Sequence, residues 1–168
     1  AVNSGYFLLF RYNSKTKDWQ KHLLHFAGGS NSYQQSTYQG YVAGMESIVE
    51  GGHFGGYVTT VKKQSSAPID PVSLKSVTKR IEDGVSVMNF FGHSNAASFD
   101  VGIDDPENWN NKGKYPFVIG NGCNSGDVYS TQESFSHRLL SIPNAGGIAF
   151  LSPSSLGYDY YMNKYTTA

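Results

Sequence analysis

Cys123 and His93 are the two residues whose side chains and positions suit nucleophilic catalysis. Each stands just beyond a short apolar segment, 85–91 for the histidine and 115–120 for the cysteine. Their separation of 30 residues leaves room for a loop and one strand, so neighbouring parallel strands would bring both side chains to one sheet edge. An imidazole within about 3–4 Å of a thiol acts as its base, and the ion pair favours the thiolate. The pattern predicts a cysteine nucleophile with a histidine base.

Glycines surround both candidates, with Gly92 before His93 and Gly122 and Gly126 on either side of Cys123. Glycine permits tight turns and a close approach of the backbone to a substrate, and backbone N–H groups near the thiol would then form an oxyanion hole. A lone cysteine is commonly a small buried side chain, and a lone histidine at a strand end is commonly a structural residue. The residues by themselves leave both interpretations open.

The other histidines suit chemistry less well. His22 and His25 are three residues apart, so on a strand they face opposite sides and cannot share a metal ion. His53 lies in a glycine-rich turn, and His137 is expected on a helix after the cysteine. We expect no metal site from these residues.

Two further segments have weak binding signals. The acidic residues Asp104, Asp105 and Glu107 lack the spacing of a helix–loop–helix calcium site, so a solvated loop is expected. Gly28 and Gly29 lack the known phosphate-binding patterns, so a strand-to-helix turn is expected. No cofactor is expected.

Composition excludes several classes of protein. The 168 residues suffice for one domain with one core. Lys and Arg together number 13, as do Asp and Glu, so a broad basic face for nucleic acid is not expected. Apolar residues make up 39% and aromatic residues 14%, which excludes a disordered chain. A single cysteine excludes a disulfide framework.

No transmembrane segment or leader peptide is visible in the sequence. The chain starts without Met, so we expect a mature product or an excised domain.

Short apolar strands alternate with helical segments along the chain. The predicted strands are 5–12, 21–27, 56–62, 85–91, 115–120 and 147–151. The predicted helices are 30–50, 70–84 and 131–140, with another beginning in the tail 157–168. The apolar positions expected to face the core are Tyr38, Tyr41, Val42, Met45, Ile48 and Val49 in the first helix and Leu74, Val77 and Ile81 in the second. This order predicts an α/β three-layer sandwich with a mostly parallel sheet.

Two segments resemble the gingipain-like cysteine peptidases of the caspase/hemoglobinase group. They are Asn89-Phe-Phe-Gly-His93-Ser-Asn and Val118-Ile-Gly-Asn-Gly-Cys123-Asn-Ser-Gly-Asp127. In that family one strand runs into a Gly-His motif that supplies the base, and a following strand runs into a Cys-x-x-Gly-Asp segment that supplies the nucleophile. Within the group, the sequence is most similar to the PorU-type sortase of the type IX secretion system of Bacteroidetes. The resemblance covers roughly residues 19–158.

The resemblance implies a caspase-like sheet and a cysteine peptidase or sortase-type transpeptidase that acts on secreted proteins. It implies Cys123 as the nucleophile and His93 as the base. The expected backbone oxyanion donors are Gly92, Ser94 and Cys123, and the expected substrate contacts are Asn95, Asn124, Ser152 and Ser154.

Two positions depart from the family pattern. Ser94 stands where the family often has Gly, and the segment 28–35 has no acidic residue where some gingipains carry carboxylates. The third catalytic residue is therefore unassigned.

The organisation and setting follow from the same resemblance. Residues 19–168 are expected to form a gingipain-like peptidase domain of a larger protein, and residues 1–18 an unassigned strand and turn. The expected partners are a polypeptide substrate and other secretion-system components, and the expected location is secreted, at the cell surface or at the outer membrane of a bacterium.

Two alternatives remain. One is a catalytically inactive gingipain-like binding or scaffold domain of a secretion or cell-surface system, which an unassigned third residue would suit. The other is a small-molecule-binding α/β domain, for which the turn at 28–29 is the only hint.

Overall fold

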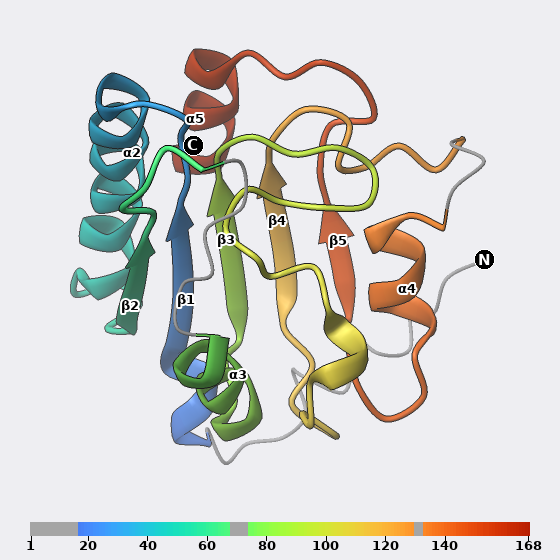
Figure 1. Cartoon of the computed structure of the whole chain (residues 1–168). Coiled ribbons are helices and arrows are strands. Elements are labelled where there is room, and N and C mark those ends of the chain that lie inside the picture. The colour runs from blue at the N-terminus through green and yellow to red at the C-terminus, as the bar shows by residue number, and fades with distance from the viewer. Residues whose placement is uncertain (1–16, 68–73, 130–132) are drawn as a thin grey trace.

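The computed structural model describes residues 17–67, 74–129 and 133–168. Within these ranges the strands form one parallel sheet in the order β2-β1-β3-β4-β5 (Figure 1). The strands are β1 His22–Ala27, β2 Tyr57–Lys62, β3 Val87–Phe91, β4 Phe117–Asn121 and β5 Ala149–Leu151. The helices are α2 Ser32–Glu50, α3 Leu74–Asp83, α4 Phe135–Ser141 and α5 Asp159–Thr167, with short 3-10 turns at Asp18–Lys21 and Pro106–Asn108.

The alternation of strands and helices predicted from the sequence is confirmed for the described residues, and the tail folds as α5. The predicted strand at 5–12 and the predicted helix start at Asp70 and Pro71 lie outside them. In α4, Ser134 caps the first turn, with its hydroxyl accepting from His137 N–H at 3.3 Å.

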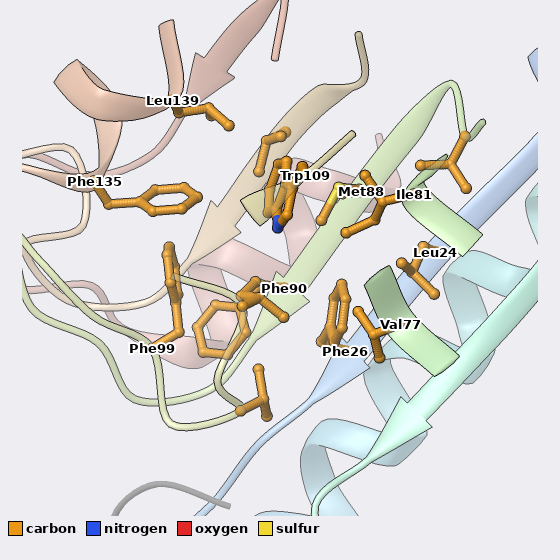
Figure 2. Packing of buried hydrophobic residues seen from close by; sticks show 14 residues of the cluster. Leu24, Phe26, Val77, Ile81, Met88, Phe90, Phe99, Trp109, Phe135 and Leu139 are labelled. Atoms are coloured by element: carbon orange, nitrogen blue, oxygen red, sulfur yellow. The ribbon is translucent and has the colours of Figure 1, made fainter. Parts of the chain in front are cut away.

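Both faces of the sheet are covered by helices, which gives the predicted three-layer arrangement. On one face, α3 and α4 and the long loop after β3 enclose the larger core. Figure 2 shows the rings of Phe90, Phe99 and Phe135 in series in this core, with centroid separations of 4.6 and 4.9 Å between successive rings. Edge-to-face contacts of this kind add to the apolar burial.

The other face carries the smaller core beneath α2 and α5, formed by Ala27, Tyr38, Val42, Met45 and Phe91 with Tyr41 and Met162 against it. The burial predicted for the apolar face of α2 is confirmed in the middle of the helix, at Tyr38, Val42 and Met45. Ile48 was wrongly expected to be buried, since it is 58% exposed. It lies beyond Met45, the last buried residue of the helix.

A buried ion pair ties three of the sheet's connections together. Lys63 directly follows β2, its side chain is fully buried, and its ammonium lies 3.4 Å from a carboxylate oxygen of Asp100. The same oxygen accepts from Gly29 N–H at 2.8 Å. The carboxylate also packs on Gly28 and Gly92, where a Cβ atom would collide with it. Asp100 therefore joins the end of β2, the turn after β1 and the loop after β3.

Lys63→Met is expected to lower the free energy of unfolding by about 3–5 kcal/mol, because it leaves a buried carboxylate without its cation. Lys62→Met is the matched control, since Lys62 is exposed on the neighbouring position. Adding Asp100→Asn to Lys63→Met should recover most of the loss, because the amide is neutral and still accepts from Gly29. Urea unfolding measures the free energy of unfolding of the three variants. Equal stabilities of Lys63→Met and Lys62→Met would show that the buried ion pair does not stabilise the fold.

Candidate active site

The pairing of β3 with β4 brings His93 and Cys123 to neighbouring positions. The strands are parallel neighbours in which Phe91 pairs with Asn121, so each candidate lies two residues beyond the last paired row. Gly92 N–H extends the ladder by donating to Asn121 O at 3.2 Å. The prediction that both residues follow adjacent parallel strands is confirmed.

The loops that carry the two candidates are joined directly. Ser94 Oγ donates to the carbonyl oxygen of Cys123 at 2.9 Å. Gly122 lies close beneath this bond, because a Cβ atom there would meet Ser94 Oγ and would lie 3.0 Å from Gly92 O. Ser94 therefore uses its side chain to hold the loop that carries Cys123, and glycine at position 122 allows the two backbones to approach.

Gln34, in the first turn of α2, sets the orientation of His93. Its Oε1 atom lies 3.0 Å from His93 Nε2 and also accepts from Ser30 N–H at 3.0 Å. An amide oxygen only accepts hydrogen bonds, so this network assigns the imidazole proton to Nε2. The lone pair of the neutral ring then lies on Nδ1.

The first turn of α2 holds Gln34 in place. Asn31 caps the helix, with its side chain accepting from Gln34 N–H at 3.0 Å. The spacing of Asn31 and Gln34 is a helix-start pattern visible in the sequence. Sequence reasoning searched the segment 28–35 for an acidic residue and so passed over the neutral amide that contacts the histidine.

The thiol of Cys123 is half-buried, and its Sγ donates to Gly157 O at 3.7 Å. The segment before α5 also contacts the rest of the loop that carries Cys123. Asn124, which has a left-handed backbone with φ of 56°, donates its N–H to Ser155 O at 2.8 Å, and Gly126 N–H donates to Pro153 O at 3.0 Å. In this arrangement the thiol proton is directed at a backbone carbonyl.

A buried row of amides fixes α5 and hence the segment that contacts the thiol. Asn121 donates to Asn89 Oδ1 at 2.9 Å and accepts from Thr166 Oγ1 of α5 at 3.0 Å. Asn89 in turn contacts the Met45 sulfur at 2.9 Å. Because Asn89 and Asn121 are both almost fully buried, these bonds restrict how α5 sits on the sheet.

The predicted oxyanion donors differ in their availability. Gly92 N–H is engaged by Asn121 O, so an oxyanion role for it would require that ladder bond to break. Among the described residues, no hydrogen bond uses the backbone N–H of Ser94 or Cys123. Of the three predicted donors, Gly92 is therefore the one whose N–H is already bonded.

The four residues expected to contact substrate differ in their hydrogen-bond partners and in their exposure. Asn95 uses its side chain within its own turn, accepting from Ala97 N–H at 2.8 Å and from Ser98 N–H at 3.0 Å. Ser152 Oγ donates to Gly120 O at 2.8 Å and bonds to Ser125 Oγ, so it links β4 to the loop that carries Cys123. Ser154 is exposed and Asn124 is half-buried.

The weaker candidates have other structural roles. His25 is 2% exposed and burial lowers its pKa, while His22 is exposed on the opposite side of β1. The Glu107 carboxylate of the acidic loop receives two bonds from Arg138, of 2.9 and 2.8 Å. In the described ranges, no group of three or more His, Cys, Asp or Glu side chains is placed to hold a metal ion.

No helix among the described residues is both long enough and apolar enough to cross a membrane.

Gly122→Ala is expected to lower the free energy of unfolding by about 1–3 kcal/mol, since the added methyl group collides with Ser94 Oγ and overpacks the site. It should also change the alkylation rate of Cys123, because the two loops must move apart. Gly44→Ala is the matched control, as a Cβ there meets nothing within 4 Å, and it should stabilise the helix by about 1 kcal/mol. Urea unfolding and thiol alkylation measure both variants. Unchanged stability of the Gly122 variant would show that the close approach is not required.

Comparison with solved structures shows the same fold in cysteine proteinases. The structure of the Arg-specific cysteine proteinase gingipain R (RgpB) matches with a TM-score of 0.65 and 18% identity, over 92% of this chain and 37% of that one. The complex of Porphyromonas gingivalis RgpB pro- and mature domains matches with a TM-score of 0.66 and 16% identity, with the same coverage. A structure described only as a protease matches with a TM-score of 0.71 and 20% identity, over 91% of this chain and 33% of that one.

These matches establish the caspase-like α/β fold, and the chain spans about a third of the length of the structures it matches. No curated protein sequence matches the chain. The model of peptidase family C25 matches residues 9–168, nearly the whole sequence. The chain therefore belongs to peptidase family C25.

Proposed function

We propose that this chain carries the catalytic centre of a cysteine peptidase, with Cys123 as nucleophile and His93 as base. The observation that carries the proposal is the hydrogen bond between Gln34 Oε1 and His93 Nε2. It leaves Nδ1 as the basic nitrogen on a ring that stands at the strand end next to that of Cys123. Membership of family C25 supports the same assignment.

The proposed reaction begins when the Cys123 thiol turns from Gly157 O and passes its proton to Nδ1 of His93. The thiolate attacks the carbonyl carbon of the scissile peptide bond, and the negative oxygen accepts from the N–H groups of Ser94 and Cys123. The imidazolium then returns the proton to the leaving amine, so that an acyl-enzyme remains. Gln34 accepts from Nε2–H in each of these steps.

The acyl-enzyme has two chemical outcomes. Attack by water completes hydrolysis, and attack by an amine completes transpeptidation. The sequence resemblance to the PorU-type sortase supports the second outcome. It also supports a secreted, cell-surface or outer-membrane location, a polypeptide substrate and partners in a secretion system.

A catalytically inactive binding or scaffold domain on the same fold is the second candidate. Two observations favour it, namely that the group beside His93 is a neutral amide rather than a carboxylate and that the thiol is directed at Gly157 O. A carboxylate would stabilise a positively charged imidazolium more strongly than an amide does.

The first test is covalent capture by a set of peptidyl chloromethyl ketones with different side chains before the ketone. Wild-type protein should form a one-to-one adduct at Cys123 near neutral pH, faster than a free thiol with a pKa of about 8.5 reacts. His93→Ala should slow capture by about 100-fold or more, and Cys123→Ala should form no adduct while keeping its thermal midpoint. Intact-protein mass spectrometry follows the adduct.

His137→Ala is the matched control, because the His137 side chain is 66% exposed on α4, and it should react like wild type. No adduct with any electrophile, together with a clear loss of thermal stability in Cys123→Ala, would refute the enzyme. A cysteine that only fills the core leaves a cavity on truncation, with a cost of about 1 kcal/mol or more. That result would favour the binding or scaffold domain.

The second test concerns the neutral amide. Gln34→Leu removes the acceptor for both His93 Nε2–H and Ser30 N–H, so the ring is free to take the wrong tautomer, and capture should slow by about 10-fold or more. Gln34→Glu keeps an acceptor oxygen and should restore most of the rate. Capture kinetics with the same electrophile measure both variants.

Gln35→Leu controls for loss of a glutamine in the same helical turn, since Gln35 donates to Gly29 O and Ser65 O rather than to the histidine. If Gln34→Leu and Gln35→Leu react alike, the amide at position 34 does not orient the base.

A further inference from the structure

Tyr38 lies one helical turn after Gln34 and contacts the same histidine. Residues four apart share a helix face, and the rings of Tyr38 and His93 meet edge to face with centroids 6.2 Å apart. We propose that Tyr38 is a positioning residue, whose aromatic ring holds the plane of the His93 imidazole so that Nδ1 faces the Cys123 thiol. This inference rests on the proposed function and extends it to a residue that the motifs do not include.

The ring of Tyr38 is itself held in place. It is 7% exposed and packs against Phe91 of β3 with a centroid separation of 5.2 Å and against Tyr41 at 6.5 Å. Phe91 is fully buried and stands two residues before His93. Tyr38 therefore presents a fixed surface to the imidazole rather than a mobile one.

Two contacts are needed because one hydrogen bond does not define a ring plane. The bond from Nε2 to Gln34 fixes one atom of the imidazole, and the ring can still tilt about that point. The terminal torsion of histidine has a broad distribution, so a second contact against the ring narrows it. Gln34 and Tyr38 together then determine the direction of Nδ1.

The phenol hydroxyl remains neutral beside the site. Burial raises the pKa of Tyr38 to about 12, and the negative charges of Asp159 and Asp100 add to the effect. The contact with His93 is one between two rings, and no hydrogen bond among the described residues joins the Tyr38 hydroxyl to His93, so phenylalanine should be able to replace tyrosine.

The kinetic experiment compares capture by the peptidyl chloromethyl ketone that labels wild type fastest. Tyr38→Leu should slow capture by about 10- to 100-fold, the range expected when a catalytic group is misplaced by about 1 Å. Tyr38→Phe should retain at least about half of the rate, since it keeps the ring contact. Tyr41→Leu is the matched control, because Tyr41 also packs on Phe91, at 5.0 Å, on the same helix. Phe91 still holds the Tyr38 ring in that variant, so it should slow capture far less than Tyr38→Leu does.

Two kinetic outcomes overturn the proposal. If Tyr38→Phe slows capture as much as Tyr38→Leu, the hydroxyl rather than the ring is required. If Tyr41→Leu slows capture as much as Tyr38→Leu, the effect is a general loosening of α2 on the sheet.

A second readout does not depend on catalysis. In Cys123→Ala protein with 15N-labelled histidine, the Nε2–H signal of His93 should be visible because its hydrogen bond slows exchange with water, and His93→Ala assigns it. Tyr38→Leu should broaden or abolish this signal, whereas Tyr38→Phe and Tyr41→Leu should keep it. If wild-type protein captures no electrophile, the proposed function fails and this signal still decides the role of Tyr38. A sharp signal that Tyr38→Leu leaves unchanged overturns the proposal.

Discussion

The parallel register of β3 and β4 is the constraint on which the candidate site depends. Because Phe91 pairs with Asn121, the chain leaves both strands at the same level of the sheet, and His93 and Cys123 follow at equivalent positions. Parallel strands place all their carboxyl ends at one edge, where the connecting loops meet. The bond from Ser94 Oγ to Cys123 O and the close approach at Gly122 are possible only in this register.

The same edge of the sheet contains a buried ion pair, whose two charges lose their hydration when the protein folds. The buried Lys63 pairs with Asp100, which is itself part of the loop that carries His93, and burying two charges is tolerated only when each has partners. Asp100 meets this requirement through one oxygen, since Oδ2 accepts from Gly29 N–H and pairs with Lys63, whereas its buried Oδ1 has no hydrogen-bond partner among the described residues. The ion pair therefore couples the loop that carries His93 to the turn that leads into α2, so His93 and the Gln34 amide that contacts it share one anchor.

The sequence was enough to predict the strands and the two candidate residues, His93 and Cys123. It was not enough to predict the side chains that contact His93, for a physical reason. Apolar runs of four to seven residues identify buried strands whatever their partners are, so β1, β3 and β4 were predictable. Gln34 was missed because a neutral amide near a helix start is usually a capping residue, and Tyr38 because its spacing with Val42 and Met45 is that of any core residue. Ile48 was misjudged because helical periodicity does not reveal where the sheet beneath a helix ends.

The sequence by itself determined the alternation of strands and helices, the family, and the presence of one thiol and one imidazole beyond two apolar strands. These properties are local, since they depend on residue type and spacing along the chain. Only the tertiary structure decided which side chains surround the imidazole, which nitrogen carries its proton, and that the thiol is directed at Gly157 O. Those contacts join residues 29 to 59 positions apart, and no local pattern encodes a contact that exists only after the sheet has formed and the helices have packed on it.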